Sequence, residues 1–243
     1  PKYSIKNHEI TGAEALVRWE RDNGTILSPN SFIPVYENNG KITDLDFYVF
    51  TRVVEFIAEN LKAGIEQVPI SINASSLHAS DPQTIDIYMN ILKKHGVDPA
   101  MVEIELTETA VVSEYKSVRK LFDSFQMHGI KTAMDDFGSG YSVLNTIVDI
   151  PVDVIKIDRG FITSCLETDR GIYFLKHLIA MIQNLGYQII CEGVETDEQI
   201  EILRQIGCDE IQGYWYSKPL PMEDYKELLQ TEKISKGGAK HPN

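Results

Sequence analysis

Cysteine is scarce in this 243-residue chain, and its distribution argues against two kinds of stabilising site. Cys165, Cys191 and Cys208 are odd in number, widely spaced and outside any Cys-x-x-Cys pair. That pattern disfavours a disulfide framework and a structural zinc site, and it is typical of a reducing compartment. Long apolar runs are also missing, since none approaches the length of a membrane span, and no signal peptide is evident. We therefore expect a cytoplasmic globular domain.

Positive charge is in short supply as well. The chain has 23 Lys and Arg against 36 Asp and Glu, which gives a net charge of −13. Such a balance argues against binding of DNA, RNA or an anionic membrane through a general basic field. An anionic ligand would have to be held by metal ions or by a few local cations.

Short apolar runs alternate with helical segments along nearly the whole chain. Strands are expected at residues 2–5, 11–19, 68–73, 102–106, 130–135, 152–157, 188–192 and 210–212. Helices are expected at residues 32–40, 43–61, 83–95, 114–128, 169–185, 196–206 and 222–229. About eight such units favour an α/β fold, a TIM-like (β/α)8 barrel, over an open doubly wound sheet. No Gly-x-Gly-x-x-Gly fingerprint follows the first strand, which weakens the dinucleotide-binding alternative.

The predicted elements form one domain over residues 1–234. Residues 235–243 are rich in Gly and Lys and are expected to form a disordered tail. Because the chain starts at Pro1 without a Met, we expect a piece of a longer polypeptide. Two start signals place helices within the domain: Thr43 with Asp46, and the capping box of Thr196 with Gln199.

The stretch Met134 to Tyr141, with the sequence MDDFGSGY, is the most informative part of the chain. It puts two adjacent carboxylates, Asp135 and Asp136, at the end of a predicted strand. Neighbouring side chains of a strand point to opposite faces, so both acids can serve one site only if the strand stops there. Gly138 and Gly140 would then supply the positive-φ turn. For the Asp pair alone, a solvated turn is an equally good interpretation.

Polar side chains also follow the other predicted strands. At or near the strand ends stand Asn73, Glu105, Asp135, Asp136, Lys156, Glu192 and Gln212, and Glu14 and Arg18 come from the strand at 11–19. Each alone is adequately explained as a helix cap, a turn residue or a solvated charge. In a parallel barrel, however, all these strand ends meet on one face, where active sites are built. Taken together they therefore predict a single site.

The donor atoms of this set are oxygens. Carboxylates and an amide suit Mg²⁺ or Mn²⁺ better than zinc or copper. The set Glu14, Asn73, Glu105, Asp135 and Asp136 exceeds what one Mg²⁺ takes from protein, so two metals are expected, with Asp135 as the bridge. Two metals are a device for in-line displacement at phosphorus. No His stands at a predicted strand end, and no Ser or Cys nucleophile motif is evident. Metal-activated water is therefore the expected nucleophile, and phosphate-ester hydrolysis the expected reaction. Lys156 is either a salt-bridge partner or a group that positions this water.

Ordered sequence blocks carry a resemblance to a known family. They are Glu14-Ala15-Leu16 with Arg18, Asn73 in ISINAS, Glu105-Leu106-Thr107-Glu108, Asp135-Asp136-Phe137-Gly138, Lys156-Ile157-Asp158, Glu192-Gly193-Val194-Glu195 and Gln212-Gly213. In this order the blocks resemble the EAL-domain cyclic di-GMP phosphodiesterases from Pro1 to about Leu229. The resemblance implies a barrel whose first strand is antiparallel to the others and is here truncated at the N-terminus. It implies hydrolysis of cyclic di-GMP to linear 5′-pGpG, the alternative being a catalytically silent cyclic di-GMP receptor.

The resemblance also implies residue roles. It assigns the first metal to Glu14, Asn73, Glu105 and Asp135, and the second to Asp135, Asp136 and Glu192. It assigns substrate contacts to Leu16, Arg18, Asn73, Asp158 and Gln212. It implies as catalytic residues Lys156, which holds the water, Glu192, a metal ligand or general base, and Glu108, which anchors the loop 137–142.

Further expectations concern cofactors and partners. The cofactors are two Mg²⁺ or Mn²⁺ ions per site, and Ca²⁺ is expected to inhibit because its looser coordination suits in-line geometry poorly. The family implies a homodimer and an upstream sensory or GGDEF domain in the parent chain. Some family parents are membrane proteins.

Overall fold

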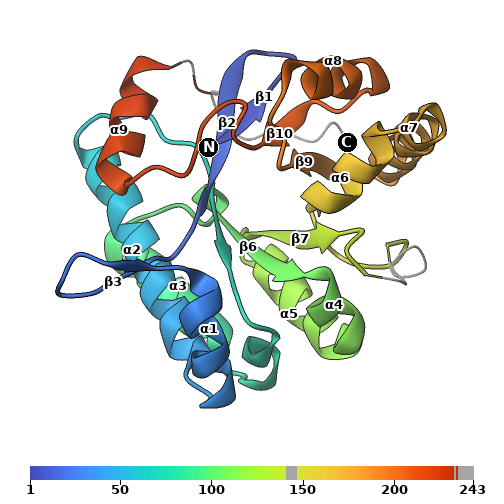
Figure 1. Ribbon diagram of the computed structural model, residues 1–243. Coiled ribbons are helices and arrows are strands. Elements are labelled where there is room, and N and C mark those ends of the chain that lie inside the picture. Colours follow the sequence, from blue (N-terminus) through green and yellow to red (C-terminus); the bar gives the residue numbers. More distant parts are fainter. Residues whose placement is uncertain (141–146, 233, 235–243) are drawn as a thin grey trace.

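The computed structural model describes residues 1–140, 147–232 and 234, and eight of its strands close into a barrel (Figure 1). Around the barrel the order is β1 (Lys2–Ser4), β10 (Glu210–Gln212), β9 (Gln188–Glu192), β8 (Val154–Ile157), β7 (Lys131–Phe137), β6 (Val102–Thr107), β5 (Ile70–Asn73) and β2 (Glu9–Ala15). β1 is antiparallel to both of its neighbours, β2 and β10. The other neighbouring strands are parallel. The TIM-like barrel with an antiparallel first strand is thereby confirmed.

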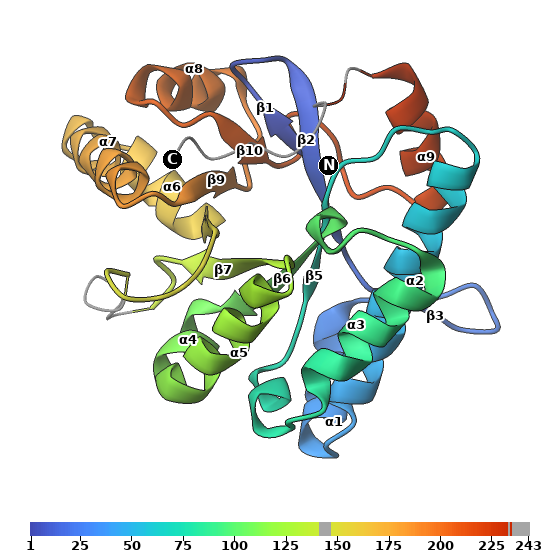
Figure 2. The same cartoon turned by 180° about the vertical axis from the view of Figure 1, so that it is seen from behind.

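Helices surround the barrel on its outer side (Figures 1 and 2). They are α1 (Pro29–Asn38), α2 (Ile42–Lys62), α3 (Thr84–His95), α4 (Glu108–Ser113), α5 (Tyr115–Met127), α6 (Arg159–Leu166), α7 (Asp169–Asn184), α8 (Asp197–Ile206) and α9 (Met222–Thr231). Two short 3₁₀ turns, η1 (Ser76–Ser80) and η2 (Pro99–Met101), lie in the connections. Within the described part of the chain, no helix combines the length and apolar character that crossing a membrane requires.

Apolar side chains fill the layer between barrel and helices. Phe50, Tyr88 and Phe125 are fully buried, and the Tyr88 ring meets the Phe50 ring edge-on with 4.4 Å between centroids. On β6, by contrast, Glu103 and Glu105 are buried although charged. They are two residues apart and therefore share one face of the strand. The burial of these carboxylates among ionic partners marks the barrel as the place where the site is built.

One strand ends well before its predicted boundary. The strand expected at 11–19 is β2, which ends at Ala15, where its pairing with β5 runs out at Ile72. Beyond it, a separate hairpin pairs β3 (Trp19–Glu20) with β4 (Ile26–Leu27). Arg18 consequently lies in the connection and does not continue the face of Glu14.

The long helix predicted at 43–61 is observed as α2, but the predicted start signal of Thr43 with Asp46 is wrong. α2 begins at Ile42, and Lys41 in the capping position makes no side-chain cap. Asp46 turns inward instead, where its Oδ2 accepts a hydrogen bond from the Ser75 N–H at 2.8 Å and lies 3.0 Å from His78 Nε2. The capping box of Thr196 and Gln199 at the start of α8 is confirmed.

Two short helices escaped the prediction because they follow a strand without a separate apolar period. Thr107 caps α4 by accepting from the Ala110 N–H at 3.3 Å, and Asp158 caps α6 by accepting from the Phe161 N–H at 3.1 Å. The expected tail at 235–243 lies outside the described residues.

Candidate metal centre

The two neighbouring aspartates reach one site through an irregularity within β7. The strand does not stop at Asp135 but runs on to Phe137. Its register against β8 shifts between Met134, opposite Ile155, and Phe137, opposite Ile157, so that Asp135 and Asp136 together face a single residue. Asp136 has a φ of 57°, the left-handed conformation that Asp tolerates better than most residues. The bulge, and not a strand end, removes the alternation that would have turned the two carboxylates apart.

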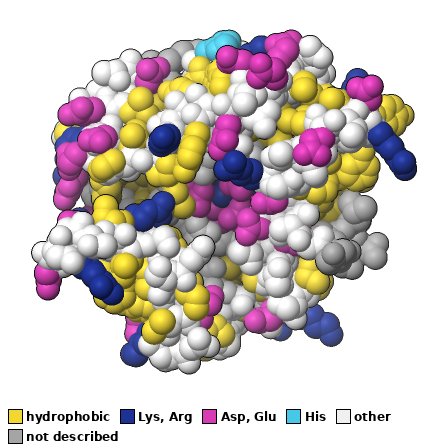
Figure 3. All heavy atoms as spheres, viewed as in Figure 1, with side chains coloured by type: hydrophobic (Ala, Val, Ile, Leu, Met, Phe, Trp, Pro, Cys, Tyr) yellow, Lys and Arg dark blue, Asp and Glu magenta, His cyan; other side chains and the backbone are white. Residues whose placement is uncertain are grey.

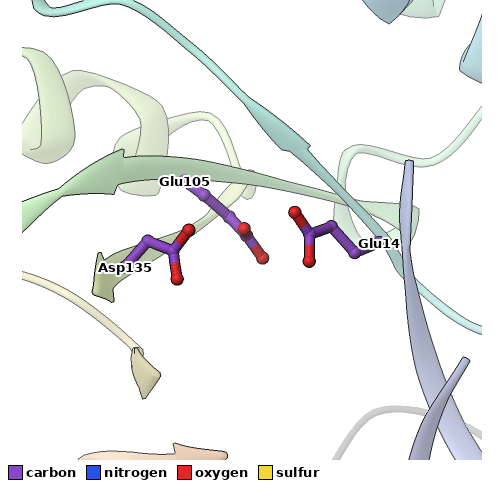
Figure 4. A group of neighbouring side chains, drawn as sticks. All are labelled: Glu14, Glu105 and Asp135. Atoms are coloured by element: carbon purple, nitrogen blue, oxygen red, sulfur yellow. The ribbon is translucent and has the colours of Figure 1, made fainter. Parts of the chain in front are cut away.

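Carboxylates from four strands gather in two overlapping groups. Glu14, Glu105 and Asp135 form the first group and point toward one another (Figure 4), and Asp135, Asp136 and Glu192 form the second. Within each group one oxygen of every residue lies within 4.8 Å of the others. Asp135 belongs to both groups. Figure 3 shows acidic side chains gathered in the hollow at the centre of the face seen in Figure 1.

Lys156 lies among these carboxylates and is fully buried. Its Nζ lies 2.7 Å from Glu105 Oε2, 2.8 Å from Glu192 Oε1, 3.1 Å from Glu14 Oε2 and 3.1 Å from Asp135 Oδ1. Despite burial, the surrounding carboxylates hold the pKa of the ammonium well above its ordinary value. Lys156 thus lies within ion-pair distance of four of the five acidic side chains that make up the two groups.

The excess negative charge is visible in the carboxyl pKa values. Burial outweighs the attraction of Lys156 and raises the pKa of Asp135 to about 6 and that of Glu192 to about 8. Burial and the nearby Asp158 also raise the pKa of Asp136. For Glu105 the effect of burial is outweighed by Lys156 and Lys2, which lower its pKa to about 2. A buried site with this surplus of carboxylates fits divalent cations.

The remaining oxygens support that fit. Asn73 Nδ2 donates to Glu14 Oε1 at 2.7 Å, and Gln212 Nε2 donates to Glu14 Oε2 at 2.6 Å. Both amide groups are thereby turned so that the nitrogens face the carboxylate. Among the described residues the buried Gln212 Oε1 makes no hydrogen bond, and the buried Asp135 Oδ1 has the ion-pair contact with Lys156 as its polar contact. Among the described residues, neither His nor Cys takes part in the two groups, so the donors are hard oxygens, which suit Mg²⁺ or Mn²⁺.

Glu108 lies beside the cluster rather than in it. It is 3% exposed, and its Oε2 accepts a hydrogen bond of 2.7 Å from the Gly138 N–H. A side chain at Gly140 would overlap its other oxygen, Oε1, so this glycine allows close approach of the loop. Glu108 thus contacts the segment that follows Asp136, at Gly138 and at Gly140. The rest of the loop expected at 137–142 lies outside the described residues.

Within the described part of the chain, no hydrogen bond or ion pair joins the predicted site residues Arg18 and Leu16 to the carboxylate groups. Both are exposed, and Arg18 Nη1 donates to the Val17 carbonyl at 2.9 Å. Arg18 lines a cavity of about 460 Å³ whose walls include Trp19, Asp44 and Tyr48. This cavity was missed because its walls come from the hairpin, α1 and α2, which sequence spacing does not bring together.

Lys2 is a buried residue near the carboxylates that the sequence analysis did not single out. It is 4% exposed, and its Nζ lies 2.7 Å from Glu103 Oε1 and 3.2 Å from Glu105 Oε1. As a lone Lys in a three-residue strand, it carried no motif signal. Only barrel closure brings it to Glu105.

Known proteins are similar to this chain in sequence and in architecture. The EAL domain family model matches residues 1–219. The cyclic di-GMP phosphodiesterase NbdA of Pseudomonas aeruginosa is 32% identical over 230 residues, which are 95% of this chain and 29% of NbdA. The oxygen sensor protein DosP of Escherichia coli is 33% identical over 224 residues, 92% of this chain and 28% of DosP. The chain thus spans less than a third of the length of these two relatives.

A solved structure, the PaMucR phosphodiesterase in complex with c-di-GMP, superposes with a TM-score of 0.85 at 29% identity, covering 93% of this chain and 91% of that one. The family model covers residues 1–219, and the superposition agrees with the closed barrel. This chain belongs to the EAL domain family.

Proposed function

We propose that this chain is a metal-dependent phosphodiesterase that hydrolyses cyclic di-GMP to linear 5′-pGpG. The observation that carries the proposal is the pair of oxygen-donor groups that share Asp135, with Lys156 between them. Two relatives support the choice of substrate, since one is named a cyclic di-GMP phosphodiesterase and another was solved with c-di-GMP bound.

The residues divide between two cation positions. Glu14, Asn73, Glu105 and Asp135 would hold one ion, and Asp135, Asp136 and Glu192 the other, as the two carboxylate groups indicate. When bound, two such ions polarise the phosphate oxygens and lower the pKa of a water molecule. The ions would be Mg²⁺ or Mn²⁺, because every donor is a hard oxygen.

The chain's own groups supply the remaining functions. The buried Lys156 ammonium orients the attacking water and offsets negative charge on the phosphate. Glu192, whose pKa is raised to about 8, is either a ligand or the base that accepts the water proton. The water oxygen adds to phosphorus, the P–O3′ bond breaks, and the 3′ oxygen leaves and takes up a proton. Gln212 Oε1, which has no hydrogen-bond partner among the described residues, would accept a hydrogen bond from substrate or water.

The cavity beside Arg18 is proposed to receive one guanine of the substrate. Its volume of about 460 Å³ is within the range of small-molecule sites. Trp19 and Tyr48 offer aromatic faces for stacking, and the Asp44 carboxylate can accept from the N–H groups of a guanine edge. Arg18 would contact a phosphate, and Leu16 and Asp158 the rest of the nucleotide.

The length of the relatives supports a proposal about the protein in which this domain works. Because NbdA and DosP are more than three times as long as the matched region, the domain is proposed to act downstream of a sensory or GGDEF domain. It is also proposed to work as a homodimer in the cytoplasm.

The experiment that tests the function is incubation with cyclic di-GMP and Mg²⁺ or Mn²⁺, followed by product analysis. We expect 5′-pGpG, no turnover by Glu14→Ala or Asp135→Ala, and inhibition by Ca²⁺. Asp209→Ala is the matched control, since Asp209 lies on the surface in an exposed pair with Lys6. Tight binding of cyclic di-GMP without any product would contradict the enzyme and indicate a silent receptor.

A further inference from the structure

A buried lysine links the candidate metal centre to the inner wall of the barrel. Lys2 contacts Glu103 and Glu105, which lie two residues apart on β6 and face the same side. The side chains of all three residues are nearly or fully shielded from water, with accessibilities of 5%, 7% and 0%. Burying an ammonium this deeply costs free energy unless it is paired. The contacts of Lys2 with both carboxylates are therefore needed for the folded state to be stable.

The backbone is shaped to admit the Lys2 side chain. The register of β1 against β2 shifts between Lys2, opposite Gly12, and Tyr3, opposite Ile10. A Cβ on Gly12 would lie 3.2 Å from Lys2 Cδ and 3.2 Å from the Pro69 carbonyl oxygen. The missing side chain at Gly12 therefore leaves the space through which the aliphatic part of Lys2 passes.

The two oxygens of Glu105 are held by different lysines. Oε1 lies 3.2 Å from Lys2 Nζ, and Oε2 lies 2.7 Å from Lys156 Nζ. Lys156 is shared among four carboxylates, whereas Lys2 is held between Glu103 and Glu105. Lys2 thus fixes the plane of the Glu105 carboxylate from a side that the cluster itself does not supply.

We propose that Lys2 is a positioning residue of the metal centre, which orients Glu105 as a ligand and shares the neutralisation of its charge with Lys156. The proposal rests on the proposed function, because it takes the cluster to bind divalent cations. The competing explanation is a buried ion pair that only stabilises the barrel. The two explanations differ in whether metal binding or only folding depends on Lys2.

The test is a calorimetric titration of the protein with Mn²⁺ alone, without nucleotide. For Lys2→Met we expect Mn²⁺ affinity to fall by about 10- to 100-fold, the usual effect of losing a group that orients a ligand. Glu103→Gln is the matched control, since it weakens the same buried ion pair but leaves Lys2 on Glu105. It is expected to lower the melting temperature while Mn²⁺ affinity stays close to that of the wild type. Equal affinity of Lys2→Met and wild type, or an equal loss in both variants, would overturn the positioning role.

Two further variants keep the test decisive if Lys2→Met does not fold. Lys2→Gln retains a hydrogen-bond donor without charge and is expected to bind Mn²⁺ more weakly than wild type, whereas Lys2→Arg restores the charge and is expected to rescue binding. In hydrolysis assays the metal concentration for half-maximal rate should rise in Lys2→Gln while kcat at saturating metal is largely kept. A lower kcat with unchanged metal dependence would overturn the proposal.

The titration separates this inference from the function. A wild type that binds Mn²⁺ but leaves cyclic di-GMP intact contradicts the phosphodiesterase, and weaker Mn²⁺ binding by Lys2→Gln would still support the role of Lys2. A wild type that takes up no Mn²⁺ overturns the positioning role.

Discussion

The fold holds single residues of the site in conformations and charge environments that are unfavourable for an aspartate. Asp135 is 8% exposed and stands among Glu14, Glu105 and Asp136, all of which oppose its ionisation. Asp136 adopts a left-handed backbone next to the last residue of β7. Strain and like-charge crowding of this kind concentrate at functional sites, where a ligand relieves them.

Removal of the Asp135 charge should therefore stabilise the metal-free protein while it abolishes turnover. The folded-state pKa of Asp135 is raised from 3.8 to about 6, so its favourable contribution exists at low pH and is lost as the pH rises through that value. At about pH 8, Asp135→Asn should raise the melting temperature by about 2–4 °C for each kcal/mol relieved, as expected for a chain of this length. Thermal unfolding of the wild type and of Asp135→Asn, after chelation of metals, measures this change in melting temperature.

Asp46 is a suitable comparison because it is also a buried aspartate but accepts hydrogen bonds from Ser75 and His78. Asp46→Asn should lower the melting temperature. A metal-free Asp135→Asn protein that melts below the wild type would show that the crowding of charge in the cluster is not destabilising.

At the scale of elements, the site depends on how β7 ends and on what holds its last residues. Glu108, the first residue of α4, accepts from the Gly138 N–H and lies against Gly140. The contact joins the start of a helix to the segment directly after Asp136. Alternating strands and helices were predicted from the apolar period, whereas this contact between α4 and the residues after β7 was expected only from the family resemblance.

Glu108→Ala should weaken metal binding at the group that contains Asp136. Without the acceptor, the Gly138 N–H loses its partner and the residues after Asp136 are no longer held. The metal concentration for half-maximal hydrolysis should rise about 10- to 100-fold. Glu108→Gln still offers a carbonyl oxygen to Gly138 and should remain close to wild type. If both variants weaken metal binding equally, the charge of Glu108 and not its hydrogen bond to Gly138 is what matters.

At the scale of the whole molecule, acidic charge is concentrated where the strands converge. Burial raises the pKa of Glu192 from 4.5 to about 8 and that of Asp135 from 3.8 to about 6. Both folded-state values exceed the ordinary ones, so the stability that these groups contribute when protonated is lost as the pH rises from about 4 to about 8. A divalent cation binds the deprotonated carboxylates and offsets that loss.

The gain in melting temperature on addition of Mg²⁺ should accordingly increase from about pH 6 to about pH 8. Scans with and without Mg²⁺ at several pH values measure this dependence. The double variant Asp135→Asn with Glu192→Gln should flatten it. A gain that is constant or falls with pH would contradict the link between metal binding and these two carboxylates.

The sequence alone determined the barrel class, the order of its strands along the chain and the acids that converge at their ends. The apolar period and the helix-start signal of Thr196 with Gln199 are local, which is why β9 (Gln188–Glu192) and the capping box of α8 were predicted correctly. Side-chain type is equally local, so the oxygen-donor chemistry of Glu14, Glu105 and Asp135 could be read directly.

Tertiary structure alone decided how those acids meet. The bulge at Asp135 and Asp136 exists because β7 must pair with β8 while both carboxylates face the interior, a condition that no local pattern expresses. Lys2 reaches Glu105 across 103 positions of sequence because β1 closes the barrel between β2 and β10. Contacts of this kind depend on register and closure, which are properties of the assembled sheet rather than of any single segment.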